Sequence, residues 1–254
     1  MASTLLTIDG PVATLVFDRP EKRNALDQAA WREIPEQVER AVGDPEVRVI
    51  IVRGSGGNFA AGADIAEFDT VFASRTSTLA YLALMSAATA AIEAAPLPVV
   101  AFVEGLCFGA GVAVALSCDI RVAASDARIA ITPAKLGLMY SLADTKRVVD
   151  AVGASRAKDL LFTGRVVEAD EALSIGLVDV VADEVAAKVA ELASLSSWTH
   201  AHTKAVVRKL LDGQQEESDE TRGWFADAIE GPDYGEGVAA FRSRRPPSFP
   251  PRKR

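Results

Sequence analysis

Short apolar runs bounded by turn residues alternate with longer helix-like stretches along the first half of the chain. The apolar runs predict strands at residues 5–8, 12–17, 47–52, 99–103, 120–123 and 128–131. The longer stretches predict helices at about residues 31–42, 76–95 and 110–117. Asp9-Gly10 is typical of a hairpin turn, and Asn24 or Asp27 is expected to cap the first helix. Strands separated by helices indicate an α/β fold.

The pattern changes in the second half, where helical stretches separated by glycines follow one another from Ser155 onward. Beyond Ser196 the chain becomes more charged and amphipathic, so we divide it into a core, residues 1–195, and a C-terminal helical region, residues 196–254. The second region carries several large aromatic side chains: Trp224, Phe225, Tyr234 and Phe241. They suggest packing against something large, such as another subunit. The basic, proline-rich end at 242–254 is expected to be solvated and partly disordered.

Composition excludes several classes of protein. The 254 residues are 49% hydrophobic and 24% charged, which is ordinary for a globular protein. The net charge of −8 argues against nucleic acid as the main partner, because a phosphate backbone would be repelled. Two cysteines, Cys107 and Cys118, are too few for a disulfide framework, and no metal site is expected. The N-terminus lacks the build of a signal peptide, and the apolar stretch 97–116 is interrupted by Glu104. We therefore expect a cytoplasmic protein without a membrane partner.

Two loops rich in small residues carry the candidate chemistry. FAAGADI (59–65) follows one predicted buried strand, and GLCFGAG (105–111) follows another. Small residues let a ligand approach the backbone, and free N–H groups at the start of a helix favour an anion. Two such N–H groups could form an oxyanion hole. The alternative is that the glycines only permit tight turns. A dinucleotide fingerprint is excluded, because Val114 stands where its third glycine should be.

Six segments in order resemble the crotonase, or enoyl-CoA hydratase/isomerase, superfamily over essentially the whole chain. They are FAAGADI (59–65), LPVVAFVEGLCFGAG (97–111), SCDIRVAA (117–124), KLGL (135–138), LLFTGRVVEADEALSIGLVD (160–179) and EGVAAFRSRRPPSF (236–249). The resemblance implies a spiral of ββα units with a C-terminal helical region that forms a homotrimer or a dimer of trimers. It also implies acyl-CoA thioester substrates, so that CoA enters as part of the substrate and no separate cofactor is needed.

The resemblance further implies site residues. The backbone N–H groups of Ala63 and Ala110 would form the oxyanion hole for the thioester carbonyl. The candidate substrate-binding residues are Lys22, Arg23, Ala61, Asp64, Ile65 and Gly109. Among them, Ala61 and Asp64 would lie near the adenine. Lys22 and Arg23, with Arg244 or Arg245 of a neighbouring chain, are candidates for the CoA phosphates.

The sequence departs from the superfamily where hydration and isomerisation need an acid or base. Ala113 and Pro133 occupy the two positions at which hydratases carry a carboxylate. Ser141 occupies the position of the isomerase base. Alanine and proline cannot transfer a proton, so efficient hydration would require an unexpected acid, for which Asp144 and Glu67 are the candidates.

Thr132, Pro133 and Tyr140 resemble the methylmalonyl-CoA decarboxylase branch of the superfamily. Decarboxylation needs an enolate-stabilising oxyanion hole but no base, and the two hydroxyls could hold the substrate carboxylate out of the thioester plane. That branch also has a histidine and a glutamate at the positions of Ala66 and Ala113, so the proton donor is unassigned. Alternatively, Thr132 caps a turn and Tyr140 is a buried aromatic whose hydroxyl is satisfied.

Decarboxylation of a malonyl-type CoA thioester is the favoured reaction. The alternatives are an enoyl-CoA hydratase or isomerase with atypical catalytic residues and a non-catalytic acyl-CoA binder.

Overall fold

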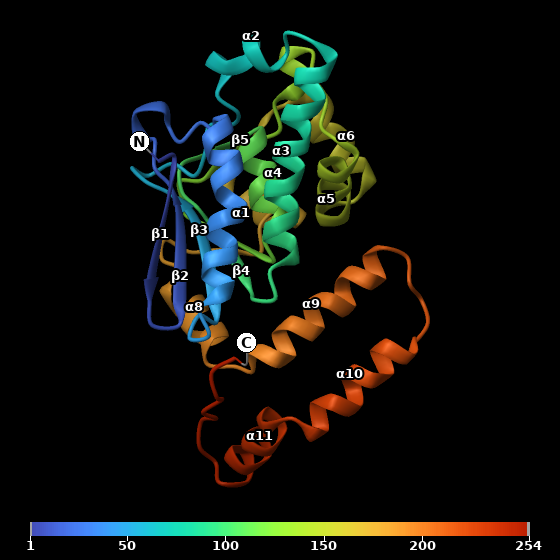
Figure 1. The fold of residues 1–254 in the computed structure, drawn as a ribbon. Coiled ribbons are helices and arrows are strands. Elements are labelled where there is room, and N and C mark those ends of the chain that lie inside the picture. The colour runs from blue at the N-terminus through green and yellow to red at the C-terminus, as the bar shows by residue number, and fades with distance from the viewer. Residues whose placement is uncertain (1, 253–254) are drawn as a thin grey trace.

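The computed structural model describes residues 2–252. Two sheets and their helices form the core, and an arm of helices extends from it (Figure 1). The larger sheet contains, in spatial order, β1 (Thr4–Asp9), β2 (Val12–Phe17), β3 (Val49–Gly54), β4 (Val99–Val103), β6 (Ile120–Ala123) and β9 (Val180–Val181). The smaller sheet contains β5 (Leu106–Phe108), β7 (Arg128–Ala130) and β8 (Val166–Glu168).

The predicted hairpin and strands are confirmed, although the strand predicted at 47–52 lies two residues later, at 49–54. β1 and β2 pair antiparallel across the Asp9-Gly10 turn, where Gly10 has a positive φ of 52°. From β2 to β9 all neighbours in the larger sheet are parallel. The β4 residues are all buried, which explains their purely apolar sequence. The strand predicted at 128–131 ends one residue earlier, because the chain turns at Ile131 towards a short 3-10 helix.

The helices cover both sheets and continue into the arm. They are η1 (Pro20–Lys22), α1 (Gln28–Gly43), η2 (Ile65–Glu67), α2 (Phe68–Val71), α3 (Arg75–Ala94), α4 (Ala110–Ser117), η3 (Pro133–Leu136), α5 (Leu142–Val152), α6 (Ala154–Thr163), α7 (Ala169–Ile175), α8 (Ala186–Ala193), α9 (Ser197–Leu211), α10 (Asp219–Glu230) and α11 (Pro232–Arg242). The most deeply placed helix is α4, all of whose residues are buried.

Of the two caps expected for α1, Asp27 is confirmed and Asn24 is wrong. Asp27 accepts a hydrogen bond from the N–H of Ala30 at 2.8 Å. Asn24 lies before the helix in a left-handed conformation, with φ at 57°. Its buried amide donates to the carbonyls of Ser55 and Asn58 at 2.8 and 2.7 Å. Asn24 therefore fixes the loop after β3 instead of capping a helix.

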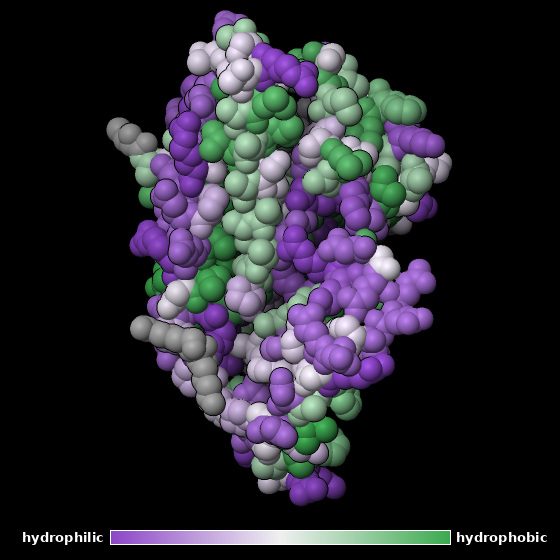
Figure 2. All heavy atoms as spheres, turned by 45° about the vertical axis from the view of Figure 1, so that its right-hand side comes forward, coloured by the Kyte–Doolittle hydropathy of each residue, from purple (hydrophilic) through white to green (hydrophobic). Residues whose placement is uncertain are grey.

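Helix α3 is long and apolar enough to cross a membrane by length and composition alone, with a mean hydropathy of 1.3. Its sequence has no charged residue between Arg75 and Glu93, so its outer face carries no charge between these two residues. Figure 2 shows apolar and weakly polar residues along this side of the core, where Leu79 and Leu82 are exposed. Its inner face, with Tyr81 and Ile92, packs into the core beside α1 and α4.

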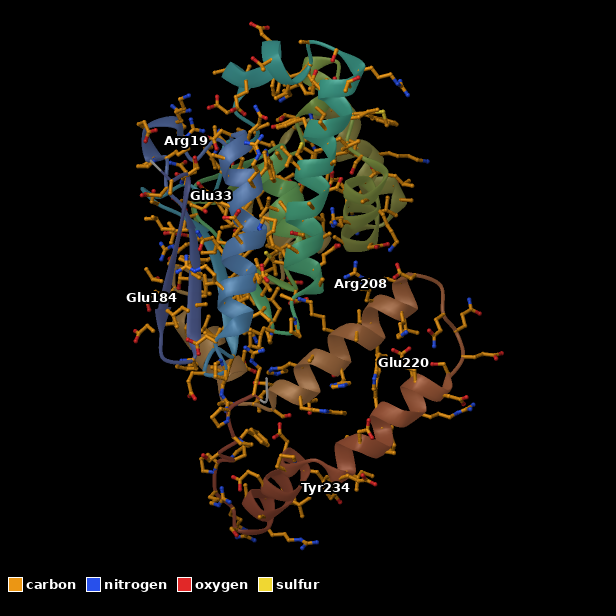
Figure 3. All side chains as sticks on the ribbon, viewed as in Figure 1. Arg19, Glu33, Glu184, Arg208, Glu220 and Tyr234 are labelled. Atoms are coloured by element: carbon orange, nitrogen blue, oxygen red, sulfur yellow. The ribbon has the colours of Figure 1, made fainter. Side chains whose placement is uncertain are left out.

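The arm of α9, α10 and α11 leaves the core and returns to it (Figure 1). Lys204 ties α9 to the core, because its Nζ lies 2.8 Å from the Asp119 carboxylate. Figure 3 shows Arg208 at the end of α9 near the core and Tyr234 on the distant α11. The aromatics Phe225, Tyr234 and Phe241 are 75%, 52% and 85% exposed. The arm thus offers unpartnered aromatic surface, and its role in trimerisation stays a prediction.

Most residues of the tail from 242 to 252 are exposed, as expected of a solvated end, but the tail is not free of the core. Arg252 donates to the carbonyls of Val42, Asp44 and Val47 at 2.8, 2.7 and 2.9 Å. Arg48 donates to the carbonyl of Phe249 at 2.6 Å. Two of these bonds go to the carbonyls of Val42 and Asp44 at the end of α1, where carbonyls lack helical partners. The tail through Arg252 is therefore docked on the core, and residues 253–254 lie outside the described residues.

Candidate active site

The two glycine-containing loops meet, because the strands that they follow, β3 and β4, are parallel neighbours in the larger sheet. The N–H of Ala60 donates to the Leu106 carbonyl at 3.0 Å, and the N–H of Phe108 donates back to the Ala60 carbonyl at 2.9 Å. A Cβ atom on Gly62 would lie 3.2 Å from the Phe108 oxygen and 3.9 Å from the Ala110 nitrogen. The glycine therefore allows the first loop to approach the start of α4 closely.

Ala63 and Ala110 lie on the two loops that meet, and neither N–H has a backbone acceptor within residues 2–252. Leu26 and Ala63 form a parallel bridge. Its two hydrogen bonds are donated by the N–H of Leu26 to the Gly62 carbonyl and by the N–H of Asp64 to the Leu26 carbonyl. The Ala63 N–H is left unused. Ala110 is the first residue of α4, so its N–H has no partner inside the helix. An oxyanion hole requires N–H donors that are free to bind the oxygen on which negative charge develops.

Gly109 caps α4 with an unusual backbone conformation. Its φ of 47° and ψ of −118° favour glycine. A Cβ atom on Gly109 would lie 3.1 Å from Thr132 Oγ1 and 3.9 Å from Gly62 Cα. Three segments therefore converge around Gly109, including the one that carries Thr132. The Thr132 side chain makes no capping hydrogen bond to η3, so the alternative role of a turn cap is not supported.

The Tyr140 hydroxyl is used inside the protein. Tyr140 is 7% exposed, and its hydroxyl donates to the Gly109 carbonyl at 2.5 Å. Burial raises the pKa of this hydroxyl well above its usual range, so it remains a proton donor. Its hydrogen is committed to Gly109 and is not free for a substrate carboxylate. This geometry fits the alternative of a buried aromatic whose hydroxyl is satisfied.

The three positions that carry acids in hydratases and isomerases lie around the same site without a carboxylate. Ala113 lies on α4 and is 2% exposed, and Pro133 begins η3. Ser141 caps α5: its Oγ accepts from the N–H of Asp144 at 3.1 Å and donates to the Asp144 carboxylate at 2.6 Å. Proton transfer at these positions would have to come from other groups or from water.

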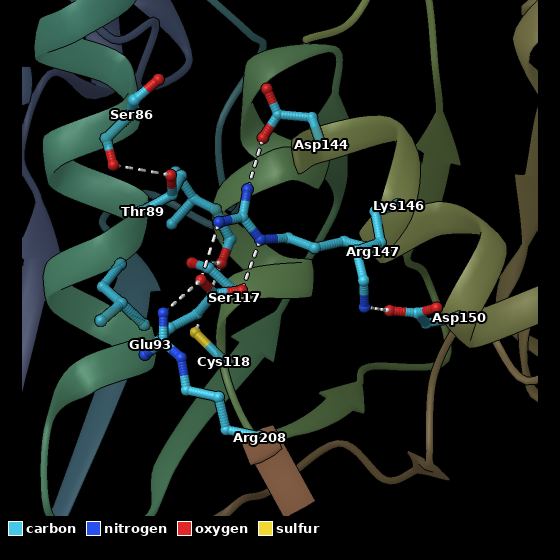
Figure 4. Close-up of polar contacts among 12 residues, drawn as sticks. Ser86, Thr89, Glu93, Ser117, Cys118, Asp144, Lys146, Arg147, Asp150 and Arg208 are labelled. Carbon is cyan, nitrogen blue, oxygen red and sulfur yellow. Dashed lines mark hydrogen bonds and ion pairs between the residues drawn. The ribbon is translucent and has the colours of Figure 1, made fainter. Parts of the chain in front are cut away.

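The two acids expected as substitutes are engaged elsewhere. Asp144 forms an ion pair of 2.6 Å with Arg147, which also pairs with Glu93 at 2.6 Å (Figure 4). The desolvation of Arg147 lowers its pKa, but Glu93 and Asp144 outweigh this effect and raise it. Glu67 accepts from the N–H of Gln28 at 2.8 Å, at the start of α1. Asp144 and Glu67 therefore serve structural contacts.

The candidate CoA-binding residues gather at the edge of the first loop. Ala61 donates its N–H to the carbonyl of Arg23 at 2.9 Å, and Ile65 beyond it is 61% exposed. Asp64 lies within 3.0 Å of Lys22 Nζ and within 2.8 Å of the Arg19 guanidinium, which Figure 3 shows beside α1. Arg19 was not among the predicted site residues, because its position before Pro20 gives no functional signal. Arg245 pairs with Glu236 of its own chain at 2.6 Å.

Replacing Asp64 with Asn should make stability less dependent on pH. Burial raises the pKa of Asp64, but hydrogen bonds from Lys22 and Arg19 outweigh it and lower the pKa below its usual value. The carboxylate therefore contributes stability above the pKa of the unfolded chain, near 4, and this contribution is lost as the pH falls through the folded pKa. As the pH is lowered from about 5 to about 3, a range that includes the unfolded-state pKa of an aspartate, Tm should fall less steeply in Asp64→Asn than in the parent. The exposed Asp9→Asn variant is the control, and equal slopes for Asp64→Asn and the parent would contradict the account.

Within residues 2–252, no group of three or more His, Cys, Asp or Glu side chains is placed to hold a metal ion. Cys107 and Cys118 are both buried and unpaired. The candidate chemistry therefore rests on backbone N–H groups and on Thr132.

Comparisons with known proteins agree with this architecture. The family model described as enoyl-CoA hydratase/isomerase matches residues 7–252. A crotonyl-CoA hydratase of Syntrophomonas wolfei is 33% identical over 253 residues, which cover 96% of each chain. An enoyl-CoA hydratase/isomerase family protein of Hyphomonas neptunium has a solved structure with a TM-score of 0.94 and 40% identity, covering 98% of both chains.

A solved enoyl-CoA hydratase/carnithine racemase from Magnetospirillum magneticum also has a TM-score of 0.94, with 32% identity over 98% of this chain and 96% of that one. The crotonase-like α/β fold expected from the sequence is confirmed by these neighbours. The relatives are named hydratases, and the decarboxylase branch finds no support among them. With its fold, loop order and full-length match, this chain belongs to the enoyl-CoA hydratase/isomerase family.

Proposed function

We propose that this chain binds an acyl-CoA thioester and stabilises its enolate with the N–H groups of Ala63 and Ala110, and that its reaction is the addition of water to an enoyl-CoA. The observation that carries the proposal is that the N–H groups of Ala63 and Ala110, on two loops that pack against each other, have no backbone acceptor within residues 2–252. Hydration is the activity in the name of the Syntrophomonas wolfei relative. CoA is bound as part of the substrate.

The proposed hydration proceeds without a carboxylate from positions 113 and 133. Water attacks the β-carbon, and the electrons of the double bond move through the α-carbon to the thioester oxygen. The N–H pair holds the negative charge that develops on that oxygen. The attacking water gives up one proton to solvent and the α-carbon takes one proton from solvent, so that one water is added in total. Because each positioned acid or base contributes about 10²–10⁴ in rate, we expect turnover well below that of a hydratase with both carboxylates.

A second candidate is decarboxylation of a malonyl-type thioester, and one observation favours it. The Thr132 hydroxyl lies beside Gly109, and Ala113 and Pro133 place no negative charge near a substrate carboxylate. Loss of CO2 leaves its electrons in the same enolate and needs no base. The candidate is weakened because Tyr140 already donates to Gly109.

Mass spectrometry of the protein incubated with crotonyl-CoA and methylmalonyl-CoA separates the two reactions. The proposal predicts slow gain of water by crotonyl-CoA. Loss of CO2 from methylmalonyl-CoA, slowed in Thr132→Ala, would favour the second candidate. Tight binding of both thioesters without any product would identify a non-catalytic acyl-CoA binder and contradict the proposed reaction.

We also propose that the arm assembles this chain into a trimer or a dimer of trimers. The exposed aromatics of α10 and α11 support this proposal, as does a hollow of about 410 Å³ between α9 and α10 lined in part by Trp198, Val206 and Trp224. Sedimentation of the full chain measures the assembly directly.

A further inference from the structure

Tyr140 contacts the same peptide unit that supplies one of the two oxyanion-hole donors. The hydroxyl of Tyr140 donates to the Gly109 carbonyl, and the next atom along the backbone is the nitrogen of Ala110. The carbonyl and the N–H of a trans peptide are coplanar and point in opposite directions. A side chain that fixes the Gly109 carbonyl on one side therefore fixes where the Ala110 N–H points on the other.

This peptide unit follows a residue with little conformational restraint of its own. Gly109 has a positive φ, and glycine permits many other conformations. Its carbonyl also accepts from the N–H groups of Val112 and Ala113, at 2.9 and 3.4 Å, within the first turn of α4. Tyr140 adds a contact from a segment 31 residues away, from a side chain that is itself buried. The restraint on the peptide therefore comes partly from outside the helix.

We propose that Tyr140 is a positioning residue that orients and polarises the Gly109–Ala110 peptide so that the Ala110 N–H becomes a stronger donor to the thioester oxygen. The inference rests on the proposed function, because it assumes that a thioester oxygen occupies the site. A hydrogen bond to a carbonyl draws electron density from the amide nitrogen, and linked bonds strengthen one another by about 10–30%. Tyr140 thus acts through the backbone without touching the substrate.

This role and a direct contact with a substrate carboxylate make different predictions. A direct contact would matter only for thioesters with a second carboxylate and would change KM. A contact through the Ala110 N–H matters for every thioester and changes kcat more than KM, because the donor interacts most strongly when the oxygen carries negative charge. We expect Tyr140→Phe to lower kcat for crotonyl-CoA by about 3- to 10-fold with KM little changed.

The decisive test uses butyryl-CoA labelled with ¹³C at the thioester carbonyl, which binds without reacting, and isotope-edited infrared spectroscopy. The parent protein should move the carbonyl stretch to lower wavenumber than in water. Tyr140→Phe should bind butyryl-CoA with a similar Kd, and its carbonyl stretch should lie between the value for the parent protein and the value in water. A full parental shift in Tyr140→Phe would overturn the inference while leaving the proposed function intact.

Two controls separate polarisation from general destabilisation. Tyr81 is also buried, and its hydroxyl accepts from Trp31 Nε1 at 3.2 Å, away from the Gly109 carbonyl. Tyr81→Phe should therefore keep the parental infrared shift even if its Tm falls. Where Ala110→Pro has already removed the donor, adding Tyr140→Phe should cost no further kcat. An additive loss would overturn the inference, and failure of the parent to bind butyryl-CoA would overturn the proposed function and this inference with it.

Discussion

Placing glutamate at positions 113 and 133 together should raise the rate of crotonyl-CoA hydration by at least about 10²–10⁴-fold, the contribution of one positioned acid or base. Ala113 is on α4, one turn after the Ala110 donor, and Pro133 begins η3 beside Thr132. The pair would supply the two proton-transfer groups that hydration needs, one for the attacking water and one for the α-carbon. Glutamate at the start of η3 is also compatible with the partial positive charge of a helix N-terminus.

The matched control for this gain is the pair of glutamines at the same two positions. Glutamine has the shape of glutamate but cannot transfer a proton, so the rate should stay near that of the parent. The two glutamates should also slow any decarboxylation of methylmalonyl-CoA, because they would repel its carboxylate. An equal gain in the glutamine pair, or no gain in a glutamate variant that still binds crotonyl-CoA, would contradict the site assignment.

Replacing Ala110 with proline should lower kcat by about 10²–10³-fold, the usual cost of removing one oxyanion-hole donor. Proline has no N–H, yet it suits the first residue of a helix, where the N–H has no helical partner. Ala110 is that residue in α4, so the helix should survive the substitution. The donor is removed while the fold is kept.

Ala154→Pro is the control, because Ala154 is the first residue of α6, is exposed, and follows Gly153. Both variants should keep the circular dichroism of the parent, and Ala154→Pro alone should keep its activity. Parental kcat in a folded Ala110→Pro variant would mean that the Ala110 N–H does not hold the reacting oxygen.

The sequence was sufficient for the strands and for the meeting of the two loops, for identifiable reasons. Apart from Arg53 near the end of β3, the residues of β3 and β4 are apolar or glycine, which is typical of buried strands. Parallel neighbours then place the loops that follow them at one edge of the sheet. Gly62 and Gly109 are needed there for close approach, so turn geometry and function share the same residues.

The direction of side-chain hydrogen bonds could not be read from the sequence. Tyr140 stood at a position that suggested contact with substrate, yet its hydroxyl donates to a backbone carbonyl 31 residues earlier. Asp144 was a candidate acid, but Arg147, one helical turn later, neutralises it. The Tyr140 contact depends on how the segment before α5 packs against the start of α4, which has no local sequence signal. The Asp144–Arg147 pair is an i,i+3 pair on one helix, so its spacing was a signal that the prediction did not use.

The contacts of the C-terminal tail also could not be predicted from the sequence. Composition indicated a solvated end, because prolines and basic residues dominate it. Arg252 nevertheless donates to three carbonyls at and just beyond the end of α1. Composition describes the average behaviour of such segments and does not record specific acceptors on a distant surface.

The central claim is that the N–H groups of Ala63 and Ala110 hold the thioester oxygen, and a crystal structure of the protein with butyryl-CoA tests it most directly. The account predicts the thioester oxygen within about 2.7–3.1 Å of both backbone nitrogens. Thr132 should border the acyl group, and the CoA moiety should run past Ala61 and Ile65. Butyryl-CoA bound with its carbonyl away from these two nitrogens would contradict the account.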